Sequence, residues 1–242
     1  MKDETDKISH LLEALDNSDK SVIRASVDSL IDIASRTPEV QQDLNRLLMD
    51  PSRKNLWSVA YILAHLPNPS RTCFEVLLDA LDTQDPDIRW AVCLLLVRLG
   101  KGDRGIVTLL IDLLRKGNPS QRRMAVYCLR DLELKDRVSL QALLESLRDP
   151  DPLVRVATVT SLKVRHDVGK DGLDILLHLF LEDPDSRVRH AAAITLAQLG
   201  APSDEIRLAL QDASQSQDPQ LKKAARAGLN LLKKKGPAST AK

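Results

Sequence analysis

The side chains that could do acid–base or metal chemistry are few and scattered along the chain. None of the five histidines is followed by glutamate, so a His-Glu pair of metal ligands is missing. The three cysteines, Cys73, Cys93 and Cys128, are odd in number and widely spaced, unlike zinc ligands or a disulfide framework, and we expect buried thiols. A phosphate-binding glycine loop and a serine nucleophile turn are also missing. The sequence therefore predicts no catalytic residue, no metal and no cofactor.

The aromatic residues offer a different chemistry, that of a binding surface. The chain has only two tryptophans and two tyrosines, which are Trp57, Trp90, Tyr61 and Tyr127. Large aromatic side chains and arginine dominate the energetics of protein interfaces. Whether these four could share one surface depends on the elements that carry them.

Those elements follow from leucines that recur at an interval of 33 residues, with one interval of 34. One column is Leu30, Leu63, Leu96, Leu129, Leu162, Leu196 and Leu229. A second runs from Leu11 to Leu176, and a third runs from Leu15 to Leu147 and then to Phe180. These columns predict seven repeats, each a hairpin of two helices. A single hairpin cannot bury its apolar face, so the hairpins must stack and share one core.

The pattern predicts an all-α chain, and we find no strand pattern. The first helices of the repeats are expected over residues 6–16, 40–49, 73–81, 105–116, 138–147, 173–181 and 204–213. The second helices are expected over residues 20–34, 53–66, 87–99, 120–132, 153–164, 187–199 and 220–234. We expect one domain over residues 1–235, with repeats at about 3–35, 36–67, 68–100, 101–133, 134–167, 168–200 and 201–235, and a flexible tail over 236–242.

Three turns share an Asp-Pro-Asp sequence that precedes an apolar residue, an arginine and alanine. They are Asp183-Pro184-Asp185 before Val188-Arg189-His190-Ala191-Ala192, Asp149-Pro150-Asp151 before Val154-Arg155-Val156-Ala157, and Asp85-Pro86-Asp87 before Ile88-Arg89-Trp90-Ala91. This motif resembles the HEAT repeat, in particular the short bacterial and archaeal form related to phycobilisome lyases. The resemblance implies a right-handed α-solenoid with the second helices on its concave surface. The signatures of tetratricopeptide and ankyrin repeats are missing.

The arginines of the motif form a column, Arg89, Arg122, Arg155 and Arg189, at the flank of the buried face. A ladder of anion sites is one interpretation. We favour a structural role, in which each guanidinium bonds a turn aspartate (Asp87, Asp151 or Asp185) and carbonyl groups of a neighbouring repeat.

The outward positions of the second helices gather the aromatic residues. Successive residues of an α-helix are 100° apart around its axis. In the second helix of the third repeat, this geometry buries Ile88, Val92 and Leu95 and turns Trp90, Leu94 and Val97 outward. The equivalent columns are Arg24, Trp57, Trp90, Arg123, Val156, His190, Lys223; Asp28, Tyr61, Leu94, Tyr127, Thr160, Ile194, Ala227; and Ile31, Ala64, Val97, Arg130, Lys163, Ala197, Asn230. The predicted partner-binding residues are Trp57, Tyr61, Trp90, Leu94, Arg98, Arg123, Tyr127 and Arg130. The outward positions of the sixth repeat look unremarkable. The alternative is that the rings pack between second helices.

The charges nearly balance, with 35 basic and 34 acidic residues, so bulk charge indicates neither nucleic acid nor membrane. The first helices carry more acidic residues and the second helices more basic ones, which predicts an acidic outer face and a basic inner face. A protein or peptide partner of acidic or mixed acidic and apolar character would fit the basic face. There is no membrane-spanning run or signal peptide, so we expect a cytoplasmic protein, and a monomer because both terminal repeats are atypical.

These features favour a non-enzymatic scaffold for protein–protein interaction. One alternative is a nucleic-acid binder that uses the basic inner face and aromatic stacking. Another is a lyase or DNA glycosylase of HEAT type, which would depend on Asp28, Asp131 or His190. Trp57 and Trp90 are followed one turn later by Tyr61 and Leu94 rather than by aspartate, which argues against the glycosylase.

Overall fold

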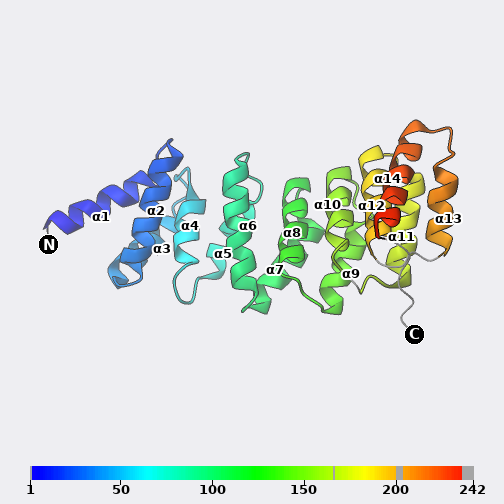
Figure 1. The fold of residues 1–242 in the computed structure, drawn as a ribbon. Helices are drawn as coiled ribbons and strands as arrows, with labels where there is room; N and C mark the ends of the chain where they lie inside the picture. The colour runs from blue at the N-terminus through cyan, green and yellow to red at the C-terminus, as the bar shows by residue number, and fades with distance from the viewer. Residues whose placement is uncertain (1, 166, 200–203, 236–242) are drawn as a thin grey trace. The chain divides into compact units, whose positions relative to one another are not determined.

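The computed structural model describes residues 2–165, 167–199 and 204–235. Over these residues the chain is all-helical, with fourteen α-helices and no strand (Figure 1), as the sequence predicts. The helices are α1 Lys2–Ala14, α2 Lys20–Ala34, α3 Pro38–Leu48, α4 Leu56–Leu63, α5 Arg71–Ala80, α6 Pro86–Gly100, α7 Arg104–Lys116, α8 Pro119–Asp131, α9 Arg137–Ser146, α10 Pro152–Leu162, α11 Gly169–Glu182, α12 Ser186–Gln198, α13 Asp204–Ala213 and α14 Pro219–Lys235. The expected tail at 236–242 lies outside the described residues.

The repeated Asp-Pro-Asp turn begins the second helices. In α6 and α12, the side chains of Asp85 and Asp185 accept a hydrogen bond from the backbone N–H two residues on, which satisfies a free amide of the first turn. Proline follows the cap directly in α6, α8 and α10, where its fixed φ suits a first helical residue. The motif is therefore a local signal for starting a helix.

Three helices start three or four residues away from the predicted bounds, and the first of them, α1, starts at Lys2 rather than at residue 6. Helix α4 starts at Leu56 rather than at residue 53, because Arg53 and Asn55 instead bond the preceding repeat. Arg53 donates to the Leu12 carbonyl at 2.8 Å, and the Asn55 amide donates to the Leu15 carbonyl at 3.0 Å. Helix α11 starts at Gly169, four residues earlier than expected.

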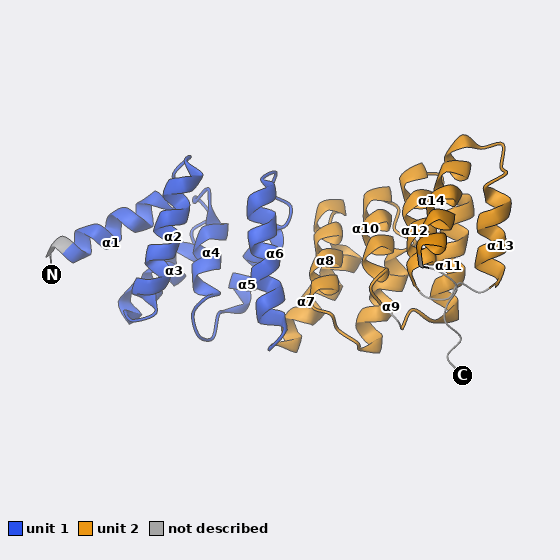
Figure 2. Ribbon diagram, viewed as in Figure 1, with its two compact units in different colours: residues 1–102 blue, residues 103–242 orange. Residues whose placement is uncertain are grey.

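The chain forms two compact units, residues 1–102 and residues 103–242 (Figure 2). Unit 1 holds three hairpins, α1/α2, α3/α4 and α5/α6, and its second helices α2 and α4 pack against each other. Unit 2 holds four hairpins, and its second helices pack in succession, α8 on α10, α10 on α12 and α12 on α14. The single domain expected over residues 1–235 stays a prediction.

The leucine columns form the core of both units. Leu30 and Leu44 in unit 1, and Leu110 and Leu129 in unit 2, have no exposed surface. Phe180, which takes the place of leucine in the third column, is also fully buried. All three cysteines are buried free thiols, as expected. In the described residues, no helix is long and apolar enough to cross a membrane.

The arginine column joins successive repeats in unit 2, but through other aspartates than those predicted. Arg122 binds Asp149 through Nε and Nη2 at 2.7 and 2.8 Å, and Arg155 binds Asp183 in the same way at 2.8 and 2.9 Å. Arg189 reaches Asp218 at 3.3 Å. The choice of Asp151 and Asp185 was wrong because those side chains cap their own helices. The guanidinium groups also donate to backbone carbonyl oxygens, which lie in the turn before the arginine's own helix rather than in a neighbouring repeat. Arg122, for example, donates to the Gly117 carbonyl oxygen.

Candidate functional site

The most exposed apolar side chains of the predicted surface lie on α6 in unit 1. Trp90 is 42% exposed and Leu94, one turn later, is 61% exposed. Arg98 follows after one more turn and is also exposed. Residues four apart share a helix face, so the three side chains form a stripe along α6. Val92, Leu95 and Leu96 on its opposite side are buried and anchor the helix in the core.

Helix α4, in the same unit, carries the other two predicted aromatic residues of unit 1. Trp57 and Tyr61 are both half-buried. The Tyr61 ring lies 4.7 Å from the ring of His65, whose Nδ1 is 2.8 Å from the Tyr61 carbonyl oxygen. Burial lowers the pKa of His65, and the charge of Arg98 lowers it further while Asp28 opposes the shift. Tyr61 is therefore in local contact with His65 through both its ring and its carbonyl group.

The remaining predicted residues, Arg123, Tyr127 and Arg130, lie on α8 in unit 2 and are all half-buried. The Arg130 guanidinium lies over the Tyr127 ring, 5.1 Å from its centroid, and binds Asp131 at 2.6 and 3.1 Å. The charge of Arg130 is thus neutralised by its neighbour, and Asp131 is itself occupied. Five of the eight predicted residues thus lie in unit 1, on α4 and α6, and three lie in unit 2, on α8.

Unit 2 contains a groove on its second helices that sequence analysis missed. The groove, about 480 Å³ in volume, lies between α10, α12 and α14. Its lining residues include no carboxylate and are Val156, Thr160, Lys163, Ser186, Arg187, His190, Ala191, Ile194, Thr195, Gln220 and Lys223. Arg187 is paired with Asp185 at 2.7 Å, whereas Lys163, His190 and Lys223 are exposed. His190 and Ile194, from the outward positions of the sixth repeat, are among the residues that line this groove.

The column positions were the available signal for this groove. Val156, His190 and Lys223 belong to the Trp90 column, and Thr160 and Ile194 belong to the Leu94 column. The third column is less informative, because Ala64, Val97 and Ala197 are buried at 1%, 7% and 0% exposure. Second helices pack against one another, as α12 does against both α10 and α14, so part of the surface of each is covered by its neighbours.

The predicted separation of charge is only partial. First-helix carboxylates are exposed, but several are paired with basic residues of the same surface. Glu75 pairs with Arg71 at 3.0 Å, Glu145 with Arg115 at 3.1 Å, and Asp174 with Lys170 at 2.8 Å. The first-helix surface is therefore mixed in sign. Within the described ranges, no group of three or more His, Cys, Asp or Glu side chains could hold a metal ion.

The helical hairpins and their ladder of arginine and aspartate define an α-solenoid, a class typical of protein-interaction scaffolds. A sequence model of the HEAT repeats matches residues 44–130, 74–163 and 140–230, and the chain belongs to this family. No curated protein matches the chain in sequence.

Two solved structures, those of Kap121p and importin beta, show the same fold. Kap121p is 13% identical with a TM-score of 0.61 over 93% of this chain and 29% of that one. Importin beta is 15% identical with a TM-score of 0.53 over 95% of this chain and 34% of that one. A designed armadillo repeat protein in complex with the peptide (KR)4 is 16% identical with a TM-score of 0.45, over 93% of this chain and 99% of that one. This chain thus spans about a third of the Kap121p and importin beta chains.

Proposed function

We propose that this protein is a non-enzymatic scaffold whose second helices bind a segment of a partner protein. The observation that carries the proposal is the exposure of Trp90 and Leu94 on α6, at 42% and 61%. Large apolar side chains such as tryptophan and leucine cost free energy when they are exposed to water. Two of them one turn apart on one helix face indicate a surface that a partner molecule covers. Typical HEAT repeats place this surface on the concave side.

The partner segment is of acidic or mixed acidic and apolar character. The apolar stripe on α6 ends in the cation Arg98, and the groove of unit 2 presents Lys163 and Lys223 with no lining carboxylate. Both features complement a chain that alternates apolar and acidic side chains. The binding residues are Trp57, Tyr61, Trp90, Leu94 and Arg98 in unit 1, and Arg123, Tyr127 and Arg130 in unit 2.

A pull-down from native lysate with quantitative mass spectrometry tests the proposal. We expect Trp90→Ala and the double variant Trp57→Ala/Trp90→Ala to lose at least tenfold in capture of specific partners, with helicity unchanged by circular dichroism. Met49→Ser is the matched control, because Met49 is more exposed, at 69%, and lies at the end of a first helix in the same unit. Equal capture by parent and folded Trp90→Ala protein would disprove this use of α6.

A nucleic-acid partner is the second candidate, favoured by the cationic lining of the unit 2 groove. Phosphate contacts release counterions, so this binding would weaken steeply with salt. A gel-shift titration with single-stranded DNA and RNA at low salt separates the two candidates. Binding that falls in the variant Lys163→Gln/Lys223→Gln, but not in Trp90→Ala, would favour nucleic acid over a protein segment.

A further inference from the structure

An ion pair between the first helices of neighbouring repeats in unit 2 has no counterpart one repeat later. Arg115, in the last turn of α7, binds Glu145 of α9 through Nε and Nη2 at 3.2 and 3.1 Å. The equivalent residues, 33 positions further along, are Arg148, just after α9, and His178 of α11. Histidine thus replaces the carboxylate. In the described part of the chain, the Arg148 side chain has neither an ion pair nor a hydrogen bond.

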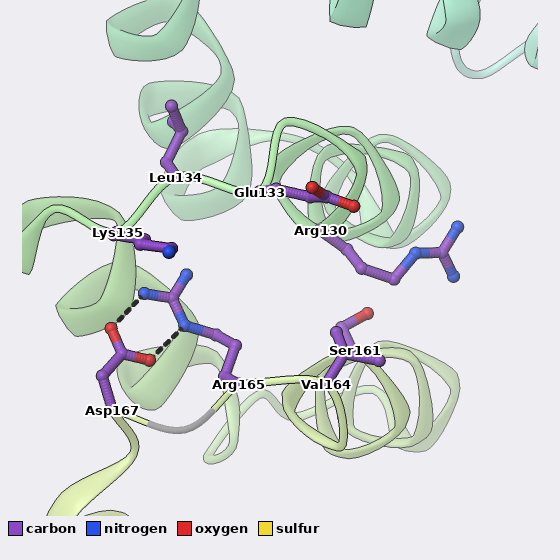
Figure 3. Close-up of a pocket in the computed structure, with 8 residues that line it drawn as sticks. All are labelled: Arg130, Glu133, Leu134, Lys135, Ser161, Val164, Arg165 and Asp167. Atoms are coloured by element: carbon purple, nitrogen blue, oxygen red, sulfur yellow. Dashed lines mark hydrogen bonds and ion pairs between the residues drawn. The ribbon is translucent and has the colours of Figure 1, made fainter.

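The other arginines that line cavities of unit 2 are bonded to carboxylates. At the cavity of about 500 Å³ near the C-terminal ends of α8 and α10, Arg165 binds Asp167 at 2.9 and 2.6 Å (Figure 3). Arg130 lines the same cavity and is paired with Asp131, and Figure 3 shows its guanidinium turned away from that of Arg165. Arg148 differs from these arginines because no bonded carboxylate offsets its charge.

Arg148 and His178 line a cavity of about 600 Å³ between the turn after α9 and helix α11. An equivalent cavity of about 280 Å³ lies one repeat earlier and is lined by Arg115 and Glu145. The Arg148 side chain contributes to the walls of both cavities. The larger cavity is therefore the one at which the ion pair between repeats is missing.

The carboxylates that line the larger cavity are already bonded to cations. The Asp149 side chain is 6% exposed and binds Arg122 through both oxygens, and Asp174 binds Lys170 at 2.8 Å. Arg148 therefore presents an uncompensated positive charge to the cavity. The two carboxylates would still repel a dianion such as a phosphate monoester, so a singly charged anion is the better complement.

A histidine and apolar side chains complete the wall next to Arg148. His178 is exposed, and its Nδ1 lies 3.9 Å from a carboxylate oxygen of Glu182, which is too far for a hydrogen bond. The imidazole ring can therefore donate a hydrogen bond to a ligand. Ile175 is half-buried, Leu179 is buried and Pro184 is exposed, and these side chains offer an apolar surface beside the charge.

We propose that this cavity binds an acidic side chain of a partner protein, next to an apolar residue of the same segment. The carboxylate takes the place that Glu145 has in the preceding repeat, and accepts hydrogen bonds from the Arg148 guanidinium and the His178 ring. The apolar neighbour contacts Ile175 and Pro184. The cavity lies among first helices and turns, so this contact is independent of the second-helix surface of the proposed function.

The probe is the peptide acetyl-Ala-Glu-Leu-Ala-amide, titrated into the full ¹⁵N-labelled chain and followed by amide chemical shifts. We expect saturable shifts at Arg148, Ile175 and His178, and none with the peptide in which glutamine replaces glutamate. Arg148→Met should bind the peptide about tenfold more weakly, because it loses the charged donor. Arg137→Met is the matched control, at an exposed arginine of α9, and should bind as the parent does.

A second variant restores the carboxylate of the preceding repeat. In His178→Glu, an ion pair with Arg148 like that of Arg115 and Glu145 would close the site. This variant should keep or raise the unfolding midpoint and bind the peptide about tenfold more weakly. His178→Gln keeps a hydrogen-bond donor without adding a charge, and should bind within about threefold of the parent.

The result with a small acid separates a protein segment from a free ligand. Pentanoate has a carboxylate and an apolar chain but no peptide backbone, and about tenfold weaker binding of pentanoate supports a protein segment. Pentanoate bound as tightly as the peptide would overturn that assignment. Equal binding of the glutamate and glutamine peptides, absence of saturable shifts, or full binding by folded Arg148→Met or His178→Glu overturns the site itself.

Discussion

The pair of Arg155 and Asp183 offers the sharpest test of how the repeats of unit 2 are held together. The Asp183 side chain is 2% exposed and that of Arg155 is 10% exposed. Arg155 also donates to the carbonyl oxygens of Asp149 and Pro150 at 2.8 and 3.1 Å. In Asp183→Ala, the guanidinium keeps these neutral acceptors but loses its counter-charge inside the protein.

Removing one partner of a buried pair costs about 3–5 kcal/mol, because the remaining charge stays desolvated. We expect this loss of unfolding free energy in Asp183→Ala, and a similar loss in Arg155→Met, which leaves the carboxylate with the Asp185 amide at 2.8 Å. The double variant should lose less than the sum of the two, by about 2–3 kcal/mol of coupling.

Urea unfolding followed by far-ultraviolet circular dichroism measures these differences. The control is Lys170→Ala, which removes an ion pair with Asp174 whose side chains are 79% and 51% exposed. An exposed pair within one helix contributes about 0.5 kcal/mol or less. Two results would show that the packing of these repeats does not depend on this pair. One is a loss of unfolding free energy in Asp183→Ala no larger than that in Lys170→Ala. The other is a double variant whose loss equals the sum of the losses in Asp183→Ala and Arg155→Met.

Two further predictions concern titrating groups. The hydrogen bond from Arg187 lowers the pKa of Asp185 to about 2, from 3.8, so its contribution to stability is present above 3.8 and is lost as the pH falls toward 2. Acid unfolding curves should show this loss, and Asp185→Asn, which keeps a capping side chain, should flatten it. Burial raises the pKa of the Cys73 thiol to about 12, and its Sγ lies 3.0 Å from the Ala60 carbonyl oxygen. Iodoacetamide at mildly alkaline pH should therefore label Cys73 only after urea unfolding, as read by mass spectrometry, and rapid labelling of the native chain would contradict this.

The fold could be read from the sequence because one physical requirement repeats. Each hairpin must bury the same face, so the columns of Leu30 and Leu44 recur at the repeat length and are buried except at the terminal repeats, where Leu11 and Leu229 are half-buried. The Asp-Pro-Asp turns mark helix starts through local hydrogen bonds that need no tertiary information. The start of α4 escaped prediction because Arg53 and Asn55 are held by residues about 40 positions away.

The candidate site was less predictable, because exposure depends on neighbours that a helical wheel does not include. The wheel treats Trp90 and Val97 alike, yet the first is 42% exposed and the second 7%. The groove near His190 is a property of three helices together, made by side chains of different length on α10, α12 and α14. The ion pair with Asp131 likewise offsets the positive charge of Arg130, and residue spacing alone does not indicate this pair.

The columns of equivalent positions differ in how much information one unusual residue carries. The Trp90 column holds arginine, tryptophan, valine, histidine and lysine, so an unusual residue there indicates little about selection. Arg165 lies in a column whose other members, Ile33, Leu66, Leu99, Leu132, Leu199 and Leu232, are aliphatic, and Leu66 and Leu132 are 7% and 5% exposed. Packing accepts leucine or isoleucine at six of its positions, so the scaffold does not require arginine at the seventh.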